Sequence, residues 1–244
     1  MEQRLTPGAS VSEIENGFRL TIPHGNGKSY RLAQLDDYTK LTRKDFPHRP
    51  SLDLSLRARA SAGSVPGTWG FGLWNDPFGM AIGFGGNPSR LPALPNAVWF
   101  FHASQESFLS FSDKPGNGFL AQAFRSPALP LGGLAKVGTT FPFSRTGARA
   151  AMGEIVEEDG VRLGLEVTEW HGYRLEWSPE RSVFWVDDRL VLETAVSPRP
   201  PLGLVIWIDN QFAAWRPDGK IGFGVLENTE PAWLEVKDLV LEER

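Results

Sequence analysis

The residues best suited to binding or catalysis lie in one stretch, Trp207 to Trp215, which reads WIDNQFAAW. If it continues as a regular strand, Trp207, Asp209 and Gln211 share a face, because alternate side chains of a strand point the same way. An indole beside a carboxylate and an amide combines a stacking surface with directed hydrogen bonds, which a sugar or other polyol requires. We therefore predict that Trp207, Asp209, Gln211 and Trp215 bind a ligand. In the alternative, Trp207 lies in the core and Asp209 caps a turn.

Two other stretches place aromatic and polar residues where they could line the same site. Trp74 and Asn75 end a run in which glycines at alternate positions, such as Gly70 and Gly72, leave one strand face without side chains. A bare strand face lets a ligand or another backbone approach closely. Trp99 lies in a later apolar run. We add Trp74, Asn75 and Trp99 to the predicted ligand-binding residues.

Catalytic residues are harder to identify in this sequence. Asp209, His102 and Glu106 carry titratable groups near the aromatic runs, but no two of them form a recognisable catalytic pair. They are weak candidates, and His102 is read first as a structural histidine. The four histidines lack metal-ligand spacing and cysteine is absent, so we expect neither a metal site nor a cofactor.

Composition restricts the classes of partner. The formal net charge is −4 and no basic run interrupts it, which argues against nucleic acid. No apolar run is long enough to span a bilayer, and the amino terminus MEQRLTPGAS lacks the pattern of a secretory signal. We therefore expect a cytoplasmic protein without a membrane partner. Nothing in the sequence indicates an oligomeric state.

The elements that must position these residues read as short strands. Runs of β-branched, aromatic and leucine residues cover 173–177, 182–186, 189–194 and 204–208, and residues 52–60 alternate apolar with polar. This spacing predicts an all-β protein, a two-sheet antiparallel sandwich with at most one short helix, over 145–156. No linker divides the chain. We expect one domain over 1–244, with strands and a loop in 1–50 and the main core in 51–244.

Some local features are also predicted. Asn26-Gly27 favours a hairpin between strands at 12–22 and 29–35, and a second hairpin is expected between 107–111 and 119–124. Residues 80–85 read as a strand. Acidic residues 157–160 read as a turn that leads into a strand over 161–167.

Two motifs resemble glycoside hydrolase family 16, the β-glucanase-like enzymes with a concanavalin A-like jelly roll. PGTWGFGLW (66–74) is similar to the family's Gly-x-Trp strand, and WHGYRLEWSPE (170–180), continuing as FWVDDRLV (184–191), is similar to its Phe-His-x-Tyr-x-Ile-Glu-Trp hairpin. The resemblance runs from about residue 50 to the end of the chain and includes the last strand, 233–241. It implies two curved sheets whose concave face forms a ligand cleft. Calcium occurs in this fold family at structural sites, but no ligand cluster in the sequence indicates one.

The sequence departs from the family where its catalysis resides. The family's Glu-x-Asp-x-x-Glu strand supplies two carboxyls about 5–5.5 Å apart. The corresponding run here, PNAVWFFHA (95–103), contains no carboxylate. We therefore expect binding of a carbohydrate-like or flat small-molecule ligand in a Trp-rich cleft, without the family's hydrolytic pair. The alternatives are a divergent glycoside hydrolase or other small-molecule enzyme, and a structural domain whose aromatic residues are all core.

Overall fold

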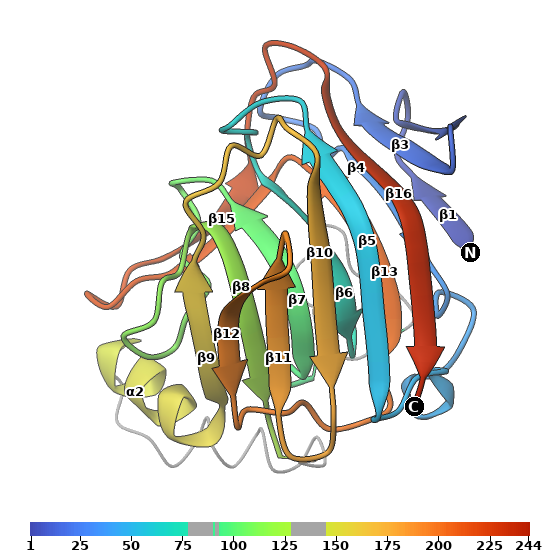
Figure 1. Cartoon of the computed structure of the whole chain (residues 1–244). Helices are drawn as coiled ribbons and strands as arrows, with labels where there is room; N and C mark the ends of the chain where they lie inside the picture. Colours follow the sequence, from blue (N-terminus) through green and yellow to red (C-terminus); the bar gives the residue numbers. More distant parts are fainter. Residues whose placement is uncertain (78–89, 91–92, 128–144) are drawn as a thin grey trace.

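Two seven-stranded antiparallel sheets packed face to face make up most of the protein, as the computed structural model shows (Figure 1). The structure describes residues 1–77, 90, 93–127 and 145–244. The predicted all-β sandwich is confirmed. The strand predicted at 80–85 lies outside the described residues.

The first sheet, called sheet A, carries four of the predicted ligand-binding residues, Trp74, Trp99, Trp207 and Asp209, on its central strands. Strands β6, β7 and β13 are buried along their whole length, so the side chains on both faces of these strands are shielded from solvent. That burial explains why their sequences read as apolar runs and not as alternating patterns. In spatial order the strands are β1 (Glu2–Leu5), β4 (Leu32–Asp36), β13 (Gly203–Asp209), β6 (Thr68–Trp74), β7 (Ala97–Ala103), β8 (Gly118–Arg125) and β9 (Glu157–Arg162).

The second sheet, sheet B, covers one face of sheet A and exposes its own other face. Strand β5 alternates buried and less buried residues, as its sequence predicts, with Leu54, Leu56 and Ala58 on the buried face. In spatial order the strands are β12 (Arg189–Thr194), β11 (Ser182–Val186), β10 (His171–Trp177), β5 (Leu52–Ala60), β16 (Ala232–Glu243), β3 (Gly17–Ile22) and β2 (Ser10–Ile14).

The core between the sheets is aromatic at its centre. Phe71 and Phe100 from sheet A meet Tyr173 and Phe184 from sheet B, and the Phe71 and Tyr173 rings lie 5.0 Å apart. Outside the sandwich are the hairpin β14 (Gln211–Trp215) with β15 (Ile221–Val225), a 3₁₀ turn (Arg43–Asp45) and the helix α2 (Arg145–Ile155). The helix agrees with the prediction over 145–156.

The hairpin predicted around Asn26-Gly27 is wrong. Strand β4 pairs with β1 and β13 in sheet A, whereas β3 belongs to sheet B and pairs with β2 and β16. The real hairpin joins β2 to β3 through Asn16, whose φ of 57° supplies the left-handed turn residue. The chain around Asn26 crosses from one sheet to the other, because β4 completes a different layer.

Two further local predictions are also wrong. Strand β8 pairs with β7 and β9, and the stretch 107–111 contributes only an isolated bridge from Phe108 to Ala214. The acidic residues 157–160 belong to β9, which pairs with β8 at the edge of sheet A. Acidic side chains are tolerated there because an edge strand has one side free of neighbours.

Candidate functional site

A layer of large aromatic rings covers the face of sheet A that points away from sheet B. Strand alternation produces this layer, because the core residues Phe71 and Phe100 point toward sheet B and their strand neighbours point the other way. The Trp74 and Trp207 rings are parallel, 6.0 Å apart, and the Trp99 ring lies 5.6 Å from that of Trp207. We call the set the outer aromatic layer: Trp74, Trp99, Phe101, Phe124 and Trp207.

The glycines of β6 make room for this layer. A Cβ added to Gly70 would lie 2.8 Å from the Trp207 ring, and one added to Gly72 would lie 2.6 Å from the Cβ of Trp99. The bare strand face predicted from the sequence is therefore occupied by the Trp207 ring from β13 and by the Cα and Cβ atoms of Trp99 from β7. The structure thus brings three of the predicted residues, Trp74, Trp99 and Trp207, into one cluster.

Each indole N–H of this cluster has an acceptor within the protein. Trp207 donates to the Thr68 hydroxyl at 2.9 Å, Trp99 to the Gln122 side-chain oxygen at 3.3 Å, and Trp74 to the Tyr38 hydroxyl at 2.6 Å. The three rings are only 4–8% exposed. They form a floor, while the less buried aromatic residues around them, such as Tyr30, Phe111 and Trp215, form its rim.

Asp209 ends β13 beside this floor and accepts four hydrogen bonds. Its Oδ1 atom accepts from the Thr68 hydroxyl at 2.8 Å, the Thr68 amide at 3.3 Å and the Gln211 amide at 3.1 Å, and Oδ2 accepts from the Tyr30 hydroxyl at 3.1 Å. Burial raises the pKa of the Asp209 carboxyl to about 6, although these bonds act in the opposite direction. Thr68 thus links the Trp207 indole to a carboxyl that titrates close to neutral pH.

The regular strand assumed for Trp207, Asp209 and Gln211 ends at Asp209. Asn210 is fully buried, and its side chain accepts from the Arg31 amide and donates to the Ser29 and Leu226 carbonyls. These bonds turn the chain out of sheet A, so that Gln211 begins β14, which pairs with β15. Gln211 therefore meets Asp209 through its backbone amide, and its side chain belongs to the hairpin.

The other residue predicted in the hairpin, Trp215, contacts the rim of the site. Its ring lies 6.1 Å from that of Phe111 in an edge-to-face arrangement, and Phe111 in turn contacts Phe124 of the outer aromatic layer at 6.3 Å. Arg149 of α2 donates to the Trp215 carbonyl at 3.1 Å and fixes the hairpin against the helix. Phe111 therefore connects Trp215 to the outer aromatic layer.

His102 and Glu106, the other weak catalytic candidates, are not brought together with Asp209. The His102 ring stacks on Trp69 at 5.4 Å, and Trp69 belongs to the core between the sheets, so His102 lies on the opposite face of β7 from Trp99. Burial lowers the pKa of His102 to about 4, which keeps its imidazole neutral at neutral pH. Glu106 is exposed in the turn after β7.

Asn75, also predicted to bind ligand, holds a loop in place. Its amide nitrogen donates to the Leu94 carbonyl at 2.9 Å, and its oxygen accepts from the Asn96 amide at 3.0 Å. Both polar ends of the side chain thus have backbone partners, and the residue is only 8% exposed. This geometry assigns Asn75 to the loop that follows β6.

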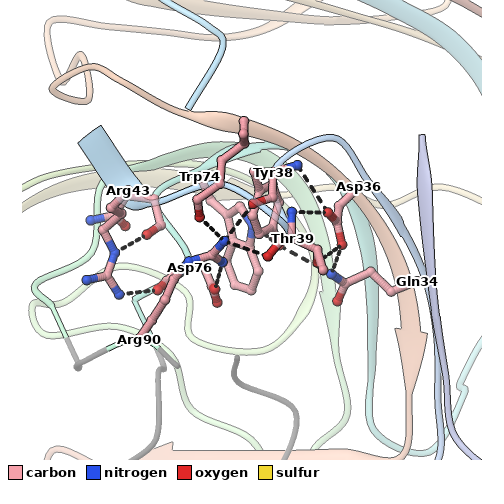
Figure 2. Close-up of polar contacts among 10 residues, drawn as sticks. Gln34, Asp36, Tyr38, Thr39, Arg43, Trp74, Asp76 and Arg90 are labelled. Atoms are coloured by element: carbon pink, nitrogen blue, oxygen red, sulfur yellow. Dashed lines mark hydrogen bonds and ion pairs between the residues drawn. The ribbon is translucent and has the colours of Figure 1, made fainter. Parts of the chain in front are cut away.

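A buried polar network borders the Trp74 end of the layer (Figure 2). Asp36 accepts from the backbone amides of Tyr38 and Thr39, from the Thr39 hydroxyl and from the side chain of Gln34. These bonds build the turn after β4 and hold Tyr38, whose hydroxyl accepts from Trp74. Asp36 therefore fixes the position of a floor residue through Tyr38.

The same network contains a buried ion pair. Arg90 contacts the Asp76 carboxylate at 2.5 Å and also donates to the carbonyls of Tyr38 and Leu41. Asp76 is fully buried with φ of 48°, and its second oxygen, Oδ1, has no hydrogen-bond partner. Arg43 donates to the backbone carbonyl of Asp76 at 2.6 Å. The network thus fixes the loop after Trp74 to the turn after β4.

No second carboxyl on this face is placed to act together with Asp209 among the residues that the structure describes. Asp36 is paired with Val205, four residues before Asp209, so the two lie about 13 Å apart along the sheet. Glu158 of β9 accepts from the Ser110 and Ser112 hydroxyls and from backbone amides of that loop. Paired carboxyls in glycosidases lie about 5–9.5 Å apart, which is less than the separation of Asp36 and Asp209. The carboxylates of Asp36 and Glu158 are instead engaged in hydrogen bonds that hold a turn and a loop.

Sequence reasoning did not identify Thr68, Gln122, Tyr38 and Arg90, which the structure places around the layer. Thr68 and Gln122 could have been found from strand alternation. Thr68 is an even number of positions from Trp74 on the same strand, and Gln122 is two positions from Phe124, so each pair points to the same face of the sheet. Tyr38 and Arg90 lie in loops, where no periodicity indicates which way a side chain points. Only the tertiary structure shows that they meet.

A cavity of about 420 Å³ has no residue of the outer aromatic layer in its lining, which consists of Phe108, Ser112, Asp113, Lys114, Pro115, Arg162 and Pro217. Lys114 pairs with Asp159 at 2.7 Å, and Arg162 donates to Asn117 at 2.7 Å. The two cations that line this cavity, Lys114 and Arg162, thus already have partners within the protein. For this reason we place the candidate site on the outer face of sheet A.

Two further observations concern the described ranges alone. They contain no group of three or more His, Asp or Glu side chains that could hold a metal ion. None of the helices in these ranges is long and apolar enough to cross a membrane.

Comparison with known proteins shows the fold. No family model and no curated protein matches the sequence. Among solved structures, the Crh5 transglycosylase in complex with NAG matches with 14% identity, 99% of this chain and 78% of that chain covered, and a TM-score of 0.51. A putative β-glucanase from Mycobacterium abscessus (14% identity, 93% and 78% covered, TM-score 0.47) and the Bacillus licheniformis β-glucanase (9% identity, 96% and 82% covered, TM-score 0.46) are also similar. The chain thus has a jelly-roll sandwich fold, as its sequence motifs predicted.

Proposed function

We propose that this protein binds a carbohydrate-like or flat small-molecule ligand over the outer face of sheet A, without a hydrolytic carboxyl pair. The observation that carries the proposal is the outer aromatic layer with one carboxyl, Asp209, at its edge. Aromatic rings provide the apolar surface on which a sugar ring stacks, and one or two polar groups fix its orientation.

The rim would make the first contacts with the ligand. The floor rings are nearly covered, whereas Tyr30, Gln211 and Trp215 are only partly buried. The Tyr30 hydroxyl bonds to Asp209, so a ligand hydroxyl that replaces this bond would reach the carboxyl directly. Trp215 would supply a stacking surface at the opposite end of the rim.

Titration against a panel of neutral oligosaccharides and aromatic metabolites tests the proposal, with tryptophan fluorescence and calorimetry as readouts. Trp215→Ala and Tyr30→Phe should weaken binding about tenfold, the loss expected for one stacking or hydrogen-bond contact. Trp185→Ala is the matched control, because Trp185 is a partly buried tryptophan of sheet B that packs against Arg174 at 4.0 Å. Binding that is lost equally in the control, or absent throughout the panel, contradicts the proposal.

A divergent hydrolase is the second candidate, and the raised pKa of Asp209 is what favours it. A carboxyl with a pKa of about 6 remains partly protonated near neutral pH and could act as a general acid. Hydrolysis would still need a nucleophile or base. Release of reducing sugar from a panel oligosaccharide, abolished by Asp209→Asn, would favour this candidate over simple binding.

A further inference from the structure

The outer face of sheet B carries a second cluster of aromatic and charged residues, distant from the site on sheet A. Arg59 lies over Trp170 at 4.9 Å and over Trp233 at 5.6 Å, and Arg19 covers Trp233 at 4.7 Å. Lys237 and Arg57 also lie over Trp170, at 4.5 Å and 5.8 Å. We call this set the cationic-aromatic patch: Arg19, Arg57, Arg59, Trp170, Trp233 and Lys237.

Sheet register places the patch in a row across the sheet. Arg57 is paired with Lys237, Arg59 with Glu235, and Glu235 with Arg19, so the cations come from the adjacent strands β5, β16 and β3. Trp170 directly precedes β10, the next strand. The row crosses four neighbouring strands, a width of about 14 Å. The strands β10, β5, β16 and β3 lie side by side on the near side of the sandwich in Figure 1.

The charge of the patch is not balanced. Glu235 is 3% exposed and pairs with both Arg19, at 2.5 Å, and Arg59, at 2.6 Å. Among the described residues, neither Arg57 nor Lys237 makes an ion pair with a carboxylate. Four cations thus share one acid in a protein whose formal net charge is −4. Cations held over indole rings at a partly exposed sheet face form a preorganised receptor for an anion.

We propose that the cationic-aromatic patch binds a carboxylated polysaccharide, a linear polymer of uronate sugars. Uronate carboxylates would pair with Arg57 and Lys237, which the Trp170 ring holds in place, and sugar C–H groups would pack against the edges of Trp170 and Trp233 that the cations leave open. Duplex DNA fits less well, because it carries one charge per about 1.7 Å and an acidic protein repels so dense a charge, whereas a uronate polymer carries one charge per sugar. This surface is independent of the function proposed for sheet A.

Binding of oligogalacturonates, measured by calorimetry at low and at moderate salt, tests the proposal. Neutral galactose oligomers of equal length and a single-stranded oligodeoxynucleotide are the comparison ligands. We expect binding of the oligogalacturonate alone, weakened by salt. The double variant R57Q/K237Q should bind about tenfold more weakly, because each exposed ion pair contributes up to a factor of about five. Trp170→Ala should weaken binding by a similar factor.

A charge-matched control separates this patch from general electrostatic attraction. R181Q/R189Q also removes two exposed charges from sheet B, from Arg181 directly before β11 and from Arg189 on β12, which lie two and three strands away from β5. It should retain the affinity of the unmodified protein. The proposal is overturned by equal losses in both double variants, by equal binding of the neutral oligomer, by tighter binding of the oligodeoxynucleotide, or by no binding at all.

Discussion

Replacement of Asp209 by asparagine should stabilise the protein at neutral pH. The amide oxygen can keep the donors that now reach Oδ1, from Thr68 and Gln211, and the amide nitrogen can donate to the Tyr30 hydroxyl, which accepts as well as donates. The hydrogen-bond network therefore survives the change. What the variant removes is the ionised carboxylate in a buried position, where charge is costly.

The magnitude follows from the pKa. The carboxyl titrates at about 6 in the folded protein and at about 3.9 in an unfolded chain, so the folded state holds the proton more tightly. The contribution of the Asp209 carboxyl to the free energy of unfolding is therefore highest below about pH 4 and is lost as the pH rises through about 6. A difference of about 2 pKa units corresponds to about 3 kcal/mol. Asp209→Asn should thus be up to about 3 kcal/mol more stable than the unmodified protein above pH 7, and nearly neutral at about pH 4.

Urea unfolding followed by tryptophan fluorescence at about pH 4 and about pH 7.5 measures this difference. Asp36→Asn is the matched control, because both oxygens of Asp36 accept hydrogen bonds, including two from backbone amides. The amide nitrogen of asparagine cannot accept a hydrogen bond, so the free energy of unfolding of this control should fall by about 1–3 kcal/mol.

A loss of stability in Asp209→Asn of equal size at both pH values would refute the reasoning. It would mean that the four hydrogen bonds outweigh the cost of burying the charge. A gain at neutral pH would instead identify Asp209 as a group retained at the expense of stability, as functional residues often are.

Two further changes test the supports of the site, each by urea unfolding. Gly70→Ala should lower the free energy of unfolding by about 2–4 kcal/mol, because the added Cβ would lie 2.8 Å from the Trp207 ring and close to the Phe100 carbonyl. The control Gly63→Ala, whose added Cβ has no atom within 4 Å, should change the free energy of unfolding by less than about 0.5 kcal/mol. Equal effects would show that the indole does not rest on Gly70. Arg90→Met should lower the free energy of unfolding by about 3–5 kcal/mol, because it leaves the buried Asp76 carboxylate without its partner. A loss below about 1 kcal/mol would mean that water reaches that carboxylate.

Much of the fold follows from the sequence. Strands at 52–60 and 171–209 were predicted because apolar alternation and turn residues act over a few positions and leave a local pattern. That Trp74, Trp99 and Trp207 could line one site was predicted from three separate apolar runs and from the family resemblance. The helix was predicted over 145–156 from its own periodicity and is observed over Arg145–Ile155. These features need no knowledge of distant contacts.

Tertiary structure alone decided how those residues are used. Trp207 rests on Gly70 and donates to Thr68, so the bare strand face is filled by the protein itself. His102 and Trp99, three positions apart, point to opposite faces, and the buried Asn210 ends the strand that would have aligned Gln211 with Asp209. Strand pairing and burial depend on residues more than a hundred positions apart, and a raised pKa depends on the surroundings they create. The sequence determined the sheets, and their packing decided which side chains could face a ligand.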